Sequence, residues 1–291
     1  MRTKRNTRNL SAARQLSLRG MGLLEQEKHE DAATLFSEAL EHSSADERAH
    51  WGLAEVQWEN GNREEALRHM AQAVELSGPD GQQDPDLMVR LGELYRDAGD
   101  MGSARVYADL ALRIDRQHAL AWSLKGAVLQ AQNQALEAMD CFQRSLIHDP
   151  ANSDARVAVA KLYRQLGQPQ RALATIDFLS DGHTAEEVPA QAWMLKGLAL
   201  ADLGEESEAK ICLRNASRCA DVDDHPLLLE LASEYHRFGD SAEARVLLGM
   251  VMQTDPQNRD ALDLQTALSQ AFSGERPRLN SFPAGSVSPV N

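Results

Sequence analysis

The 291-residue chain has little of several features that whole classes of protein need. It has three cysteines and no Cys-x-x-Cys pair, which argues against a disulfide framework or a structural zinc site and favours a reducing, cytoplasmic compartment. Its longest near-continuous apolar run, Val246 to Met252, is far shorter than the ~18 residues of a membrane span. Aromatic residues make up only 5%, whereas Ala, Leu, Glu, Gln and Arg dominate. This composition predicts an all-α protein, because these residues favour helices.

The chain is also short of positive charge, with 30 Lys and Arg against 44 Asp and Glu and a net charge of −14. A general nucleic-acid or anionic-membrane binder would need a surplus of basic residues, so neither partner is expected. The exception is the N-terminus, where Arg2, Lys4, Arg5 and Arg8 make residues 1–12 basic. No apolar segment follows them, which argues against a secretory signal, and we expect a flexible segment there.

A small residue recurs along the chain every 34 to 38 residues, and another small residue stands twelve positions before each copy. The turn between them most often carries Gly, although Glu27 stands there in the first unit. Because antiparallel helices cross closely only where neither carries bulk, each unit is predicted to be helix, tight turn, helix. The seven small pairs are Gly20/Ala32, Ala54/Ala66, Gly92/Ala104, Gly126/Ala138, Ala160/Ala172, Gly197/Ala209 and Ala232/Ala244.

These units resemble the tetratricopeptide repeat, whose pattern is W-x2-L-G-x2-Y, then A-x3-F, then P, over about 34 residues. The fourth unit carries Trp122, Gly126, Ala138, Phe142 and Pro150 at the matching positions. Seven units in register make the resemblance specific, although each unit alone matches weakly. The resemblance implies a right-handed α-solenoid of about seven helix pairs with a C-terminal capping helix.

The repeats also predict how the chain is divided. Extra residues near 78–84 and 180–188 are rich in Gly, Asp and Pro and are expected to form loops. The amphipathic segment 259–272 is expected to cap the last repeat, and 273–291, with three prolines and no period, to be a disordered tail. The repeats are predicted at 13–46, 47–80, 85–118, 119–152, 153–186, 190–223 and 225–258.

Motifs that carry enzyme chemistry are missing from the sequence. It contains no G-x-x-x-x-G-K-[ST], no G-x-S-x-G and no H-E-x-x-H, and the nine histidines have no metal-ligand spacing. We therefore predict no catalytic, cofactor-binding or metal-binding residues. The predicted function is a non-catalytic scaffold or adaptor that binds a partner polypeptide. Two alternatives remain open: a self-assembling structural protein, and a regulatory or accessory subunit of an enzyme or secretion complex.

The tryptophans fall into two classes under the resemblance, which implies that the first helices line a concave groove. Trp122 and Trp193 stand where the family keeps a packing residue, so we assign them to the core. Trp51 and Trp58 stand on the groove face and are candidate binding anchors, unless they pack against the adjacent repeat. The predicted groove residues are Arg48, Trp51, Glu55, Trp58, Glu59, Glu93, Arg96, Asp97, Lys161 and Arg164.

The charge of this face indicates the chemistry of a partner. Glu55, Glu59, Glu93 and Asp97 make its N-terminal half acidic, which favours a basic or amphipathic helix or extended peptide. The alternative is an ordinary solvated charged face. The basic N-terminal segment could also fold into the acidic groove and mask it, in which case added salt would increase partner binding.

Overall fold

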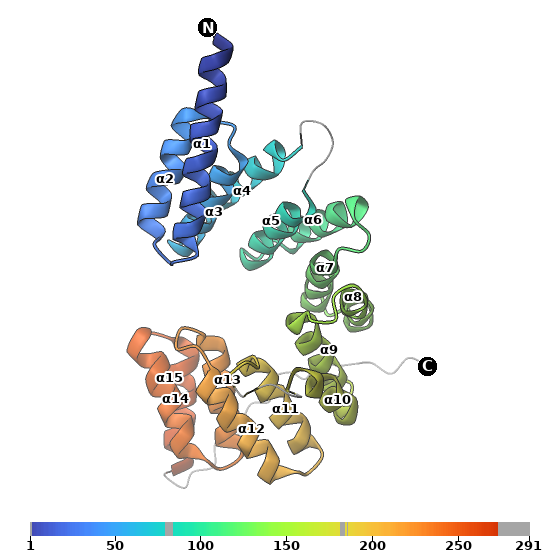
Figure 1. Ribbon diagram of the computed structural model, residues 1–291. Coiled ribbons are helices and arrows are strands. Elements are labelled where there is room, and N and C mark those ends of the chain that lie inside the picture. Colours follow the sequence, from blue (N-terminus) through green and yellow to red (C-terminus); the bar gives the residue numbers. More distant parts are fainter. Residues whose placement is uncertain (1, 79–83, 181–183, 185, 273–291) are drawn as a thin grey trace. The chain divides into compact units, whose positions relative to one another are not determined.

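The computed structural model describes residues 2–78, 84–180, 184 and 186–272, and all regular structure within these ranges is helical (Figure 1). The all-α prediction is therefore confirmed. The helices belong to two compact units, Met1–Leu162 and Tyr163–Asn291. Within the described residues, no helix is both long and apolar enough to cross a membrane.

Unit 1 consists of helices that pack as consecutive pairs, α1 with α2, α3 with α4, α5 with α6 and α7 with α8. Each pair also packs on the next, through α2 with α3, α4 with α5 and α6 with α7. The helices are α1 (Arg2–Leu24), α2 (His29–His42), α3 (Glu47–Glu59), α4 (Arg63–Leu76), α5 (Pro85–Asp97), α6 (Met101–Ile114), α7 (Ala119–Ala131), α8 (Ala135–His148) and α9 (Ser153–Gln165), which continues into unit 2.

The small residues of the repeat allow bulky side chains to fill the space between helices. Phe36 of α2 is completely buried, and its ring lies against Gly20 of α1 and Gly52 of α3. A Cβ atom built at Gly52 would lie 2.1 Å from Phe36 Cζ, and one at Gly20 would lie 2.6 Å from Phe36 Cε1. Gly126 has the same relation to Phe142, at 2.8 Å. Close helix crossing therefore explains the small residues that recur in the sequence.

The tight turns share one backbone conformation. Gly61 has a φ of +77°, in the left-handed region that glycine adopts without steric cost. Glu27 and Asn133 occupy the same region, with φ of +59° and +60°. The first repeat therefore has Glu27 in place of glycine but keeps the same conformation of the turn.

Unit 2 repeats the paired arrangement with its own core. Leu228 and Leu231 of α13 are buried beside Leu248 of α14. The last helix, α15, packs against α13 and α14 and buries Ala261 and Leu268 on them. The helices are α10 (Pro169–Ser180), α11 (Ala190–Asp202), α12 (Glu206–Cys219), α13 (His225–Arg237), α14 (Ser241–Thr254) and α15 (Arg259–Phe272).

The boundaries differ from expectation mainly at the N-terminus. Helix α1 begins at Arg2, so the structure extends the first helix through residues expected to be a loose segment. The predicted tail, 273–291, lies outside the described residues, as do 79–83, 181–183 and 185 in the two predicted loops.

Candidate functional site

Helices α3 and α5 of unit 1 are each the first helix of a repeat, and a polar network around Glu55 joins them. Trp51 Nε1 donates to Glu55 Oε1 (3.0 Å), and Arg90 Nε donates to the same oxygen (2.8 Å). Arg90 Nη2 donates to the second oxygen of Glu55. The carboxylate therefore receives donors from its own helix and from the next repeat, which fixes the Trp51 indole relative to α5.

Arg90 also pairs with Glu93, with 3.2 Å between Arg90 Nη1 and Glu93 Oε2. The hydrogen bond to Glu55 is the main cause that raises the pKa of the Arg90 guanidinium, which stays charged at any physiological pH. One cation thus lies between two of the acidic residues assigned to the groove. The face around Trp51 is consequently much less negative than the sequence pattern indicates.

The two candidate anchors are both half-buried. Trp51 and Trp58 pack with one side against the core cluster that contains Leu91 and Leu94. Arg63 lies over the Trp58 ring, with its Cζ atom 5.6 Å from the centroid. Each ring is therefore held on one side by the core cluster while part of it stays exposed, so packing and exposure coexist at these positions.

The remaining predicted residues are spread along the face. Arg48, Glu59 and Lys161 are exposed, and Arg96 forms an ion pair with Asp97 (2.8 Å). Arg164 belongs to unit 2, where its Nε donates to Asp202 Oδ2 (2.7 Å). The structure therefore brings together Trp51, Glu55 and Glu93 of the predicted set, and binding at these residues stays a prediction.

Sequence reasoning missed Arg90 and Asp202. Arg90 stands three residues before Glu93 on α5, and this i,i+3 spacing of opposite charges is a signal for a pair on one helix face. Asp202 is the thirteenth residue of its repeat, as Glu59 and Asp97 are of theirs, and this shared position is a signal that could have found it.

The assignment of Trp122 and Trp193 to the core needs correction, because both are only half-buried. Each packs one side on a core cluster and presents the other side to a lysine three positions later on the same helix. Lys125 Nζ lies 5.8 Å from the Trp122 ring centroid, and Lys196 Nζ lies 5.6 Å from that of Trp193. At both positions, one side of the indole packs on the core and the outer face reaches solvent.

The side chains that could hold a metal ion, and the thiols, bear on the chemistry of these surfaces. Throughout the ranges that the structure describes, no three His, Cys, Asp or Glu side chains gather as they would around a metal ion. Cys141 and Cys212 are buried free thiols, and burial raises the pKa of each. Their burial is that of packing residues rather than of reactive groups.

Comparison with known proteins gives matches to family models described as tetratricopeptide repeat. These matches cover residues 23–80, 56–119 and 157–214, together more than half of the chain. One curated relative, cellulose synthase operon protein C of Pseudomonas fluorescens (strain SBW25), is 28% identical over 256 residues. The match covers 83% of this chain, which spans about a fifth of the length of that relative.

Solved structures show the same fold at low sequence identity. A tetratricopeptide repeat protein from Parabacteroides merdae matches with a TM-score of 0.60 and 18% identity, covering 75% of this chain and 82% of that one. The APC/C hetero-tetramer Cut9–Hcn1 gives 0.56 and 17%, covering 88% and 42%. Pseudomonas aeruginosa pilF gives 0.51 and 14%, covering 89% and 98%. These likenesses confirm the predicted fold class of stacked helix pairs.

Proposed function

Because the chain belongs to the tetratricopeptide repeat family, we propose that it is a non-catalytic scaffold that binds a partner polypeptide across α3 and α5. The observation that carries this proposal is the network in which Glu55 holds Trp51 and Arg90. It fixes an exposed aromatic edge between two repeats, and a rigid aromatic group gives binding area at small entropic cost.

The charges on this surface indicate the chemistry of the partner. Arg90 offsets much of the charge of Glu55 and Glu93, whereas Glu59 is exposed and has no ion pair among the described residues. A partner helix that places an apolar side chain on Trp51 or Trp58 and a basic one near Glu59 fits this surface. We therefore propose an amphipathic segment in preference to a uniformly basic one.

Affinity capture followed by mass spectrometry tests this proposal. The wild-type chain is compared with a Trp51→Ala, Trp58→Ala variant, and with an Ile211→Ala, Val246→Ala variant that removes two exposed apolar side chains from unit 2. Circular dichroism verifies that each variant keeps its helicity. A Trp51→Phe, Trp58→Phe variant keeps the aromatic surface and should retain the partner if the alanine variant does not fold.

A partner that is captured by the wild type and the control, but lost by the folded tryptophan variant, supports the proposal. Retention by all variants contradicts the assigned surface. Failure to capture any partner, together with a mass that rises with concentration, would favour the self-assembling alternative.

An accessory role in an enzyme complex is supported by the similarity to cellulose synthase operon protein C. Under this alternative, an enzymatic activity would be measured only when the chain is purified together with its partner. We further propose a reducing, cytoplasmic compartment for either role, which is supported by the absence of a disulfide at the buried Cys141 and Cys212.

A further inference from the structure

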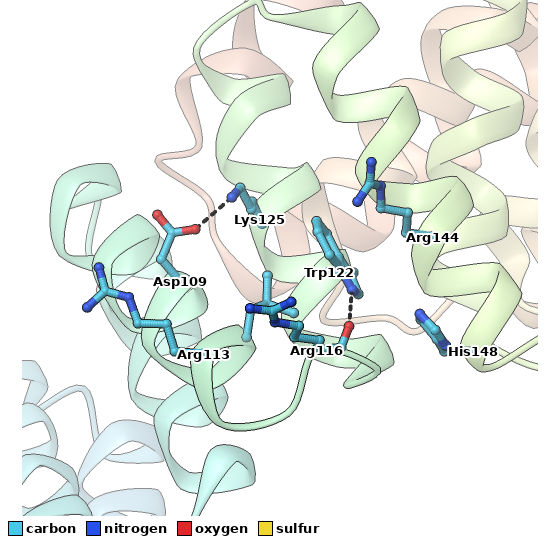
Figure 2. Close-up of a pocket in the computed structure, with 8 residues that line it drawn as sticks. Asp109, Arg113, Arg116, Trp122, Lys125, Arg144 and His148 are labelled. Carbon is cyan, nitrogen blue, oxygen red and sulfur yellow. Dashed lines mark hydrogen bonds and ion pairs between the residues drawn. The ribbon is translucent and has the colours of Figure 1, made fainter.

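A cationic pocket surrounds Trp122 on the part of unit 1 formed by α6, α7 and α8. It has a volume of about 570 Å³, and the residues that line it lie around the indole (Figure 2). We call it the Trp122 cup and define it by Asp109, Arg113, Arg116, Trp122, Lys125, Arg144 and His148. The cup shares no residue with the α3–α5 surface around Trp51 and Trp58.

Two cations of the cup are already paired, and two are not. Lys125 Nζ lies 2.7 Å from Asp109 Oδ1, and Arg144 Nε lies 2.9 Å from Asp140 Oδ2. Arg113 and Arg116 are exposed, and neither forms an ion pair with any residue that the structure describes. The cup thus has two exposed guanidinium groups without an ion pair, although the chain has a net charge of −14.

Trp193, which stands at the equivalent repeat position and is also half-buried, provides an internal comparison. Trp193 has Lys196 three positions later, and Lys196 Nζ lies 2.8 Å from Asp177 Oδ1. This arrangement repeats the one that Lys125 and Asp109 make beside Trp122. The triad of tryptophan, lysine and aspartate is therefore a packing device of the fold that occurs once in each unit.

The basic residues of the cup are not part of that device. At the repeat positions equivalent to Arg144 and His148, the sequence around Trp193 has Asn215 and Cys219. Neither is basic, and yet the triad forms. Packing of the indole thus does not require a basic residue at these two positions.

The geometry of the cup restricts the kind of anionic ligand that could bind there. Arg144 Cζ lies 4.8 Å and Lys125 Nζ 5.8 Å from the Trp122 ring centroid, and the indole N–H donates to the Arg116 carbonyl (2.9 Å). The ring therefore has little surface left on which a base or sugar could stack. In Figure 2, Arg113 lies on one side of Trp122 and Arg144 on the other, so the guanidinium groups are spread around the indole and do not converge on one point. Separated cations fit several separate anionic groups better than one phosphate.

We propose that the Trp122 cup binds a short acidic segment of a partner polypeptide, with carboxylates on Arg113 and Arg116. The guanidinium fork matches a carboxylate with two parallel hydrogen bonds. The acidic remainder of the chain would repel a long uniform polyanion, so nucleic acid is disfavoured. The inference rests on the proposed function only in taking the ligand to be a polypeptide.

Fluorescence anisotropy with a labelled tetraglutamate peptide, flanked by Gly and Ser, tests this site on the full chain at low salt. The test variant is Arg113→Gln, Arg116→Gln. The matched control is Arg14→Gln, Arg19→Gln, which removes the same charge from exposed positions of α1. We expect the test variant to weaken binding about tenfold and the control less than about twofold, since two exposed charge pairs are lost at the site. A tetraglutamine peptide should not bind.

Three results would overturn the proposal. The first is failure of the wild type to bind the peptide, the second is equal weakening of binding by both variants, and the third is displacement of the peptide by pyrophosphate or single-stranded DNA at equal charge concentration. A dimer that dissociates only in the test variant would assign the cup to a second copy of this chain. The Trp51→Ala, Trp58→Ala variant should bind the peptide like the wild type, so failure of the cup and failure of the α3–α5 surface are distinguishable.

Discussion

Glu27 holds a φ of +59°, and Asn133 holds one of +60°, where five other turns use glycine. A side chain with a Cβ atom is strained in this region, and Asn tolerates it better than Glu. The first turn therefore costs free energy that the glycine turns do not. Such a position is kept because the helix pair on either side fixes the conformation of the turn.

Replacing Glu27 with Gly should stabilise the chain by about 1 kcal/mol, because relief of left-handed strain outweighs the greater freedom of glycine in the unfolded state. Urea unfolding followed by circular dichroism measures the change. Glu25→Gly, two residues earlier in a turn position without positive φ, should be neutral or destabilising. A loss of stability for Glu27→Gly would refute this account of the turn.

Burial of Cys141 and Cys212 raises the pKa of both thiols and so lowers their thiolate fraction at pH 8. Cys219 is half-buried. A thiol reagent at pH 8 should label Cys219 at least about tenfold faster than the other two, which should react only after unfolding. Cys219→Ser should remove the fast phase, and its persistence in that variant would contradict the assignment.

Helix pairs meet where one helix has a glycine and its neighbour an aromatic ring. Phe36 lies between Gly20 of α1 and Gly52 of α3, so a single side chain joins two successive pairs. The ring is completely buried and has no room to move away. The packing of neighbouring repeats therefore depends on the absence of a methyl group at Gly52.

Gly52→Ala should destabilise the chain by about 2 kcal/mol, because its Cβ atom would lie 2.1 Å from Phe36 Cζ. Gly22→Ala is the matched control in α1, where a Cβ atom has no neighbour within 4 Å. It should be neutral or stabilising by about 0.5 kcal/mol, since Ala favours the helix. Thermal unfolding of both variants checks the pair, and equal effects would show that helix propensity rather than crowding dominates.

The helix pairs could be predicted because close crossing of two helices requires small residues at fixed positions, and these recur in the sequence twelve residues apart. The polar contacts of the site could not, because Arg90 reaches Glu55 from a different repeat and its direction depends on how α3 and α5 pack. The half-burial of Trp122 and Trp193 was missed for a related reason. Repeat position indicates that an indole packs, but the neighbouring repeat decides how much of it is covered.

Helix α1 was misjudged at its start, because its first residues are basic and lack the apolar period of a packed helix. The helix nevertheless begins at Arg2, so it extends beyond the part that the apolar period marks in the sequence. Periodicity therefore located the paired part of α1 but not its N-terminal end.

The chain as a whole has a core for each unit, with Leu91 in one and Leu231 in the other. Stability in a stacked repeat comes from contacts between neighbours, so distant parts of the chain need not unfold together. The tryptophans are distributed usefully for testing this, because Trp193 is in unit 2 and the other three are in unit 1.

A variant in which Trp51, Trp58 and Trp122 are replaced by Phe reports unit 2 through the fluorescence of Trp193. Trp193→Phe reports unit 1. We expect the two urea midpoints to differ, and the circular dichroism transition of the wild type to be broader than either. Circular dichroism of each variant checks that the substitutions leave overall stability unchanged. Coincident transitions by all probes would show that the chain unfolds as one cooperative unit.

The central claim, that the α3–α5 surface binds a partner, is tested most directly by hydroxyl-radical footprinting of the captured complex. Oxidation of each tryptophan is measured by mass spectrometry with and without the partner, and Trp193 serves as the internal control. The account predicts that Trp51 and Trp58 become protected several-fold while Trp193 does not change. Full occupancy by the partner with unchanged oxidation of Trp51 and Trp58 would contradict it.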